Sequence, residues 1–91
     1  MTKNELIAAV AERANIPRSA AASAVEATFA VIAGTLRKGG EVKIPGFGSF
    51  KVVKRAAREG LDLHTGQLIK IAEARSPKFS PGQALRDAVN Q

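Results

Sequence analysis

The residues best suited to binding chemistry lie in one segment, residues 45–50, and in the basic run 51–58 that follows it. Within this segment Gly46 and Gly48 flank Phe47, and glycine lets the backbone approach another surface closely or adopt a positive φ. The aromatic side chains provide large apolar faces that need burial. The basic run carries four cations and no acid. Together these residues predict a tight backbone bend, an apolar anchor and the root of a cationic arm.

The positive charge of the chain is concentrated in residues 37–58. The 91-residue chain has a net charge of +6, and this segment holds seven basic side chains and one acidic one. The residues before it and after it are each neutral overall. Such clustering favours a polyanionic partner, because cations that neutralise phosphates release condensed counterions. The alternative is a solubilising surface, which clustering disfavours.

Catalytic and metal-binding chemistry have little support. The chain has no cysteine and a single histidine, His64, which lies in a predicted loop two residues after Asp62. No nucleophile is paired with a base, and the glycines near Phe47 lack the Gly-Lys-Ser/Thr sequence of a phosphate loop. We therefore expect no catalytic residues, no metal, no cofactor and no enzymatic activity.

The size of the chain predicts one domain that shares its core with a partner. A chain of 91 residues buries a modest fraction of its surface. Much of its apolar content is alanine, and disulfides are excluded. Oligomerisation is then the expected source of stability. No run approaches the roughly 20 apolar residues of a membrane span, and no signal peptide opens the chain, so we expect a cytoplasmic protein without a membrane partner.

Periodicity and punctuation predict the order α-α-β-β-β-α. Thr2 and Glu5 form a capping box, and Asn15 before Ile16-Pro17 ends the first helix. A second helix is expected over about 18–38, strands over 41–44, 47–55 and 67–74, a loop-like tip over 60–66, a connector over 75–82 and a last helix over 83–90. The long hairpin has too few large side chains for a core of its own.

Several motifs carry a family resemblance over essentially the whole chain. They are Lys3-x-Glu5-Leu6-Ile7, Gly46-Phe47-Gly48-Ser49-Phe50, Arg55-Ala56-Ala57-Arg58-x-Gly60, Thr65-Gly66 and Pro77-x-Phe79-x-Pro81-Gly82-x-Ala84-Leu85. With these motifs the sequence resembles the bacterial nucleoid proteins of the HU and integration host factor family, and resembles HU more closely.

The resemblance implies an α+β fold and an architectural, largely sequence-nonspecific DNA-binding function. It implies one domain over 1–91 that forms an intertwined dimer, with a body of 1–55 and 75–91 and a β-ribbon arm of about 56–74 that enters the minor groove. The expected dimer core is Phe29, Phe47, Phe50 and Phe79. The expected DNA-binding residues are Lys3, Gly46, Gly48, Ser49, Lys51, Lys54, Arg55, Arg58, Leu63, Lys70, Arg75, Lys78 and Arg86. The expected location is the nucleoid.

The arm tip departs from the family pattern. Where the family usually has Arg-Asn-Pro, with a proline that wedges between base pairs, this chain has Leu61-Asp62-Leu63. One hypothesis is that Leu63 is the wedge, since leucine can intercalate. The alternative is a tip that contacts DNA little. Val53 also replaces an arginine that is common on the arm, and Ser80 and Gln83 replace common lysines.

The expected partner is double-stranded DNA, with a preference for bent, nicked or gapped duplex that lowers the deformation cost. RNA is a possible second ligand, and the partner subunit is either identical or a paralogue. The alternative function is a protein-interaction or assembly module that uses the apolar arm tip.

Overall fold

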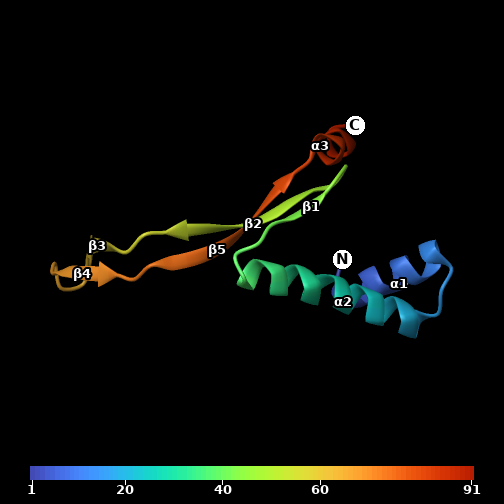
Figure 1. The fold of residues 1–91 in the computed structure, drawn as a ribbon, viewed down its shortest axis with the longest axis horizontal. Coiled ribbons are helices and arrows are strands. Elements are labelled where there is room, and N and C mark those ends of the chain that lie inside the picture. Colours follow the sequence, from blue (N-terminus) through green and yellow to red (C-terminus); the bar gives the residue numbers. More distant parts are fainter. The chain divides into compact units, whose positions relative to one another are not determined.

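In the computed structural model, which describes residues 1–91, helices lie at both ends of the chain and antiparallel strands lie between them (Figure 1). The elements are α1 (Lys3–Ala14), α2 (Arg18–Arg37), β1 (Val42–Ile44), β2 (Gly48–Arg55), β3 (Arg58–Leu61), β4 (Leu68–Ile71), β5 (Ala74–Pro81) and α3 (Gln83–Val89). The chain divides into two compact units, Met1–Gly34 and Thr35–Gln91.

The first unit is a pair of helices with well-defined ends. The hydroxyl of Thr2 caps α1 by accepting the backbone N–H of Glu5 at 3.2 Å. Asn15 ends α1 in the left-handed region, with φ of 55°, and its N–H donates to carbonyls of the last turn. Helix α2 then runs alongside α1 (Figure 1). The predicted start and end of the first helix are confirmed.

The buried core of the chain is small. Only Ile7, Ala21 and Val25 are buried, all at the contact between α1 and α2. Phe29 and Val31 of α2 are more than half exposed. By length and composition α2 could span a membrane, a test that the core helix of a soluble protein also passes. The sequence predicted no membrane span because Ser, Thr and Glu side chains interrupt the apolar residues of α2.

The second unit contains a three-stranded antiparallel sheet in the order β1-β2-β5. A tight turn joins β1 to β2, with Gly46 at φ of 82° and the N–H of Phe47 donating to the Ile44 carbonyl at 3.0 Å. A Cβ on Gly48 would lie 2.6 Å from the Ser80 carbonyl oxygen, so only glycine allows β2 and β5 to approach so closely there.

Residues 75–82 were predicted as a connector, and that prediction is wrong. Residues 75–81 belong to β5, which pairs with β2 over eight residues from Gly48↔Pro81 to Arg55↔Ala74, and Gly82 is the N-cap of α3. Strand β5 lies at the edge of the sheet, where proline is tolerated because its missing N–H leaves no ladder partner unpaired. The Phe50 and Phe79 rings, 4.8 Å apart between centroids, pack across the two strands.

The arm is an interrupted ribbon. Strands β3 and β4 pair from Arg58↔Ile71 to Leu61↔Leu68, but residues 56–57 and 72–73 separate them from β2 and β5. Gly60 and Leu61, predicted as loop, lie in β3. The turn beyond is closed by the Gly66 N–H, which donates to the Asp62 carbonyl at 2.7 Å. The α+β class and the antiparallel ribbon are confirmed, with five strands in place of three.

Candidate nucleic-acid interface

Strand register divides the cations of β2 and β5 between two faces. Successive side chains of a strand point to opposite faces, and directly paired residues share a face. The lysine face carries Ser49, Lys51, Val53 and Arg55 of β2 with Ala74, Ser76, Lys78 and Ser80 of β5. The phenylalanine face carries Gly48, Phe50, Val52 and Lys54 of β2 with Arg75, Pro77, Phe79 and Pro81 of β5.

The lysine face is a cationic surface with no acid. Lys51 and Lys78 are direct cross-strand partners, and Arg55 lies further along the same face. Lys43 of β1 pairs with Ser49 and joins this face. Like charges placed opposite one another destabilise a sheet, so a polyanion that neutralises them recovers that energy. The structure thus brings the predicted residues Ser49, Lys51, Arg55 and Lys78 together.

The turn between β1 and β2 forms a groove beside this face. Its lining includes the three residues predicted to bring backbone close to phosphates, Gly46, Gly48 and Ser49. Lys43 and Ser80 line the same groove but were not predicted as site residues. Membership of the basic segment 37–58 was the available signal for Lys43. The signal for Ser80 was that it stands where the family commonly has a lysine, and the pairing of β2 with β5 places it in the groove.

Two of the predicted cations lie on the other face. Lys54 and Arg75 are direct partners on the phenylalanine face. Lys54 forms an ion pair of 2.9 Å with Glu73, and the guanidinium of Arg75 donates to the Leu36 and Arg37 carbonyls at 3.1 and 3.0 Å. Arg75 therefore caps the C-terminal end of α2, where a positive charge is favourable.

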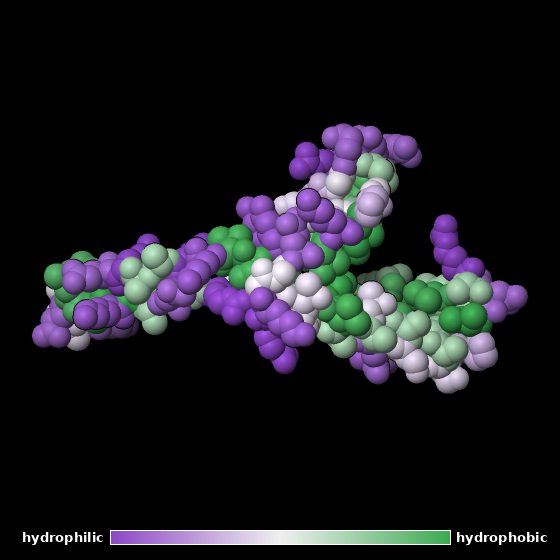
Figure 2. All heavy atoms as spheres, in the orientation of Figure 1, coloured by the Kyte–Doolittle hydropathy of each residue, from purple (hydrophilic) through white to green (hydrophobic).

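The end of the ribbon is apolar and not cationic. Residues 56–74 hold Arg58 and Lys70 against three acids. Lys70 is the direct partner of Glu59, so a carboxylate offsets its charge. Leu63 is 91% exposed in the turn, the largest exposed fraction among the large apolar side chains. Figure 2 shows apolar atoms among hydrophilic ones at this end of the ribbon.

The remaining predicted cations lie on helices. Lys3 of α1 forms an ion pair of 2.9 Å with Glu26 of α2, and both side chains are more than half exposed. Arg86 lies in the last turn of α3 and is exposed. Lys3 must leave Glu26 to contact a phosphate fully, whereas no acid is ion-paired with Arg86.

The predicted dimer-core residues form an incompletely covered aromatic cluster. Phe79 contacts both Phe47 and Phe50, with ring centroids 5.6 and 4.8 Å apart. Phe47 and Phe79 nevertheless remain 45% and 38% exposed, and Phe29 remains 52% exposed. Exposed aromatic surface of this kind is typical of an interface.

The single histidine lies in the turn of the ribbon. Groups of three or more His, Cys, Asp or Glu side chains that could hold an ion do not occur. Asp62 accepts the backbone N–H of His64 at 2.8 Å, which fixes the turn and leaves the imidazole unengaged.

A helical pair, a glycine-turned sheet with a cationic face and an extended ribbon together define a nucleic-acid-binding protein of the β-ribbon class. Residues 1–90 match the bacterial DNA-binding protein family, and the chain belongs to that family. It is 49% identical to DNA-binding protein HRL53 of Rhizobium leguminosarum over 99% of both chains. It is 48% identical to DNA-binding protein HU-1 of Halalkalibacterium halodurans over 99% of this chain and 100% of the relative.

Two solved structures of HU proteins have folds similar to that of this chain. The Anabaena HU–DNA cocrystal structure is similar with a TM-score of 0.88 and 37% identity, covering 98% of this chain and 97% of that one. HU from Thermotoga maritima is similar with a TM-score of 0.69 and 30% identity, covering 98% of both chains. The family resemblance inferred from the motifs is confirmed, and the alternative of a protein-interaction module is not favoured.

Proposed function

We propose that this protein is a dimeric, architectural and largely sequence-nonspecific DNA-binding protein of the bacterial nucleoid, in the cytoplasm. The observation that carries the proposal is the lysine face, where Lys51 and Lys78 lie directly opposite each other with Arg55 and no acid. Membership of the bacterial DNA-binding family supports it, as does the similarity to a protein solved with DNA.

Phosphate contact is the main source of affinity in this proposal. The lysine face supplies Lys51, Arg55 and Lys78, and the groove at the β1–β2 turn supplies backbone at Gly46, Gly48 and Ser49. Lys3 and Arg86 extend the path of the duplex along the helices, and Arg58 and Lys70 contribute from the ribbon end. Because these contacts are to the backbone, binding is sensitive to salt and tolerant of sequence.

Two subunits complete the site. The aromatic cluster of Phe47, Phe50 and Phe79, together with Phe29, is covered by a second subunit, which is either identical or a paralogue. The exposed fractions of Phe29, Phe47 and Phe79 support this assembly, because a folded chain rarely leaves so much aromatic surface in water. The two ribbons then embrace the minor groove of the duplex.

The ribbon end bends the duplex through Leu63. A leucine side chain exposed in the turn is suited to insert between base pairs and partly unstack them. Insertion is easier where the duplex is already bent, nicked or gapped, because less deformation energy is needed. RNA with a helical shape is a secondary ligand, bound through the same phosphate contacts.

The test is fluorescence anisotropy of the purified protein with intact and nicked duplexes of equal length at two salt concentrations. We expect tighter binding to the nicked duplex, and affinity that falls by a log–log slope of about 0.9 per neutralised phosphate as salt rises. Replacing Lys51 and Lys78 together by Gln must weaken binding to both duplexes. Weak binding that is indifferent to salt would contradict the proposal.

A further inference from the structure

The phenylalanine face repeats the charge arrangement of the lysine face. On the lysine face the direct partners Lys51 and Lys78 are both cations, and on the phenylalanine face the direct partners Lys54 and Arg75 are both cations. Each pair carries the cost of like charges placed opposite one another, and an anion relieves that cost. Glu73 offsets the charge of Lys54, and a duplex on the lysine face cannot neutralise the charge that remains on the second pair, because the strands lie between the two faces.

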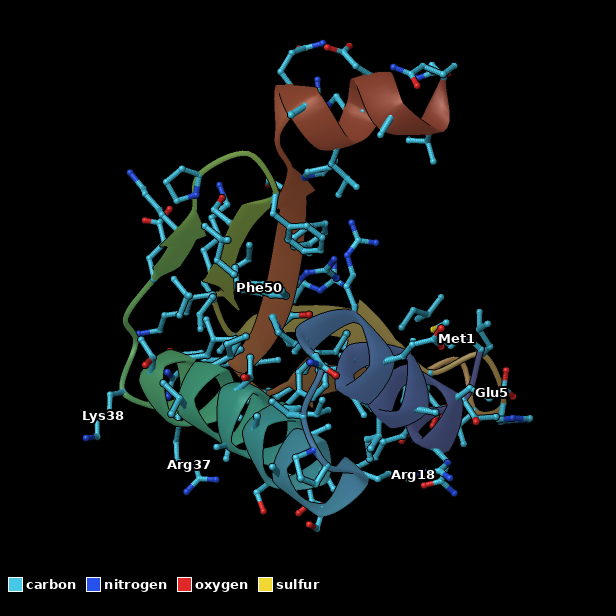
Figure 3. All side chains as sticks on the ribbon, turned by 90° about the vertical axis from the view of Figure 1, so that its right-hand side faces the viewer. Met1, Glu5, Arg18, Arg37, Lys38 and Phe50 are labelled. Carbon is cyan, nitrogen blue, oxygen red and sulfur yellow. The ribbon has the colours of Figure 1, made fainter.

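The C-terminal end of α2 adds two cations to the second pair. Arg37 and Lys38 are exposed, and Figure 3 shows their side chains directed outward from the end of the helix. They join Lys54 and Arg75 around one open hollow, which Glu73 also lines. We name Arg37, Lys38, Lys54 and Arg75 the second cationic cluster. With Glu73 included, three positive charges remain without a partner carboxylate.

Arg75 is held in place while keeping donors free. Its Nη2 group donates to the Leu36 and Arg37 carbonyls, which fixes the guanidinium beside the end of α2. The N–H groups on Nη1 and Nε remain as donors, and the guanidinium fork matches the geometry of a phosphate. A Cβ on Gly39 would lie 3.9 Å from Nη2, so the α2–β1 turn passes close to the guanidinium. A cation fixed in this way loses little entropy when it binds.

We propose that the second cationic cluster binds the backbone phosphates of a second DNA duplex, so that one dimer bridges two duplexes. This inference rests on the proposed function, since it assigns one duplex to the lysine face and the aromatic part of the phenylalanine face to the second subunit. The second duplex takes only the Lys54–Arg75 end of the phenylalanine face, four residues along each strand from Phe50 and Phe79. The strand backbones lie between the two sites, and at physiological ionic strength salt screens charges over a Debye length of about 8 Å. Each site can then be filled with little repulsion from the other duplex.

The test is a capture assay with two duplexes. One duplex is attached to beads, the other is free and fluorescent, and the protein is added at a salt concentration at which anisotropy shows single-duplex binding. The variant is Arg37→Gln with Lys38→Gln, which leaves Arg75 and its carbonyl contacts in place. The control is Arg13→Gln with Arg18→Gln, which removes the same charge from the first unit. Thermal melting verifies that both variants fold.

Wild-type protein and the control are expected to capture the fluorescent duplex. The Arg37/Lys38 variant is expected to keep its affinity for a single duplex and to capture about tenfold less, as the loss of two phosphate contacts implies. Equal capture by variant and wild type would overturn the proposal, and so would an equal loss in the control. If wild-type protein binds one duplex but captures no second duplex, the bridging proposal is overturned and the proposed function stands. Absence of single-duplex binding would refute the proposed function itself.

Discussion

At the scale of single residues, Gly48 controls how closely β2 and β5 pack. Replacing it by Ala puts a methyl group 2.6 Å from a backbone oxygen of Ser80 and 2.7 Å from the Phe79 ring. We expect Gly48→Ala to lower the free energy of unfolding by about 1–3 kcal/mol, as overpacking does. Urea denaturation followed by circular dichroism measures the change.

The matched control for this substitution is Gly34→Ala in α2. A Cβ there has no neighbour within 4 Å, and alanine favours helix over glycine. We expect unchanged or slightly greater stability, by up to about 1 kcal/mol. If Gly48→Ala were as stable as Gly34→Ala, close packing at Gly48 would not be what requires glycine.

The ion-pair partner of Lys3, Glu26, can be replaced without changing Lys3 itself. The Lys3–Glu26 ion pair is more than half exposed, so it contributes at most about 1 kcal/mol to stability. Glu26→Gln frees the Lys3 ammonium for phosphate. We expect tighter DNA binding and a log–log salt slope steeper by up to about 0.9, measured by anisotropy titrations at several salt concentrations.

Glu12→Gln is the control for Glu26→Gln. It removes the same charge from the same unit, but no cation is ion-paired with Glu12. A smaller gain in affinity is expected, because only the general charge of the chain changes. Equal gains from the two variants would mean that Lys3 does not contact DNA.

At the scale of elements, local signals predicted the helices well and the strands after β2 poorly. The capping box of Thr2 and Glu5 and the left-handed Asn15 mark the ends of α1 in the sequence itself. Strand β5 was missed because Pro77 and Pro81 suggest a connector, whereas its pairing with β2 is long-range and includes the Phe50–Phe79 contact. Pairing between distant segments overrides local punctuation.

The sequence predicted which cations belong to the candidate site but not how they are distributed between the two faces of the sheet. The basic segment and the motifs identified Lys51, Lys54, Arg75 and Lys78 as one group. Register separates them into Lys51 with Lys78 and Lys54 with Arg75, on opposite faces. A shift of the strand register by one residue would exchange the two faces. The composition of the chain therefore could not predict which cations share a face.

The ribbon turn is the element with the sharpest functional test. Leu63→Ala shortens the side chain in the turn and leaves intact the hydrogen bonds that the backbone and side chain of Asp62 form there. We expect it to bend a duplex less, because a smaller side chain holds open a base step less well and unstacking costs a few kcal/mol. The measurement is energy transfer between dyes at the two ends of a duplex.

Leu61→Ala is the control in the same ribbon. Leu61 lies in β3 opposite Leu68 and is 59% exposed, so it is outside the turn but similarly apolar. Bending should remain close to that of wild type. If Leu63→Ala bent DNA as well as wild type, the wedge hypothesis would be wrong and the turn would contribute little to bending.

At the scale of the whole molecule, the chain has more apolar surface than one copy can bury. Three buried residues make a core far too small to offset the conformational entropy of 91 residues. Stability must then depend on the concentration of subunits, because association with a second copy stabilises the folded state by mass action. The melting temperature should rise with protein concentration, and sedimentation should give the mass of two chains.

Substitution of Phe29 is a direct test of whether stability depends on a second subunit. In a single chain Phe29 is 52% exposed, so its truncation would cost little, whereas at a dimer core Phe→Ala costs about 3–5 kcal/mol. We expect Phe29→Ala to lower the melting temperature strongly and to shift the protein toward single chains at low concentration. Val31→Ala is the control, because Val31 lies about 200° from Phe29 around α2 and is 65% exposed. A small effect of Phe29→Ala, no larger than that of Val31→Ala, would place the dimer interface elsewhere.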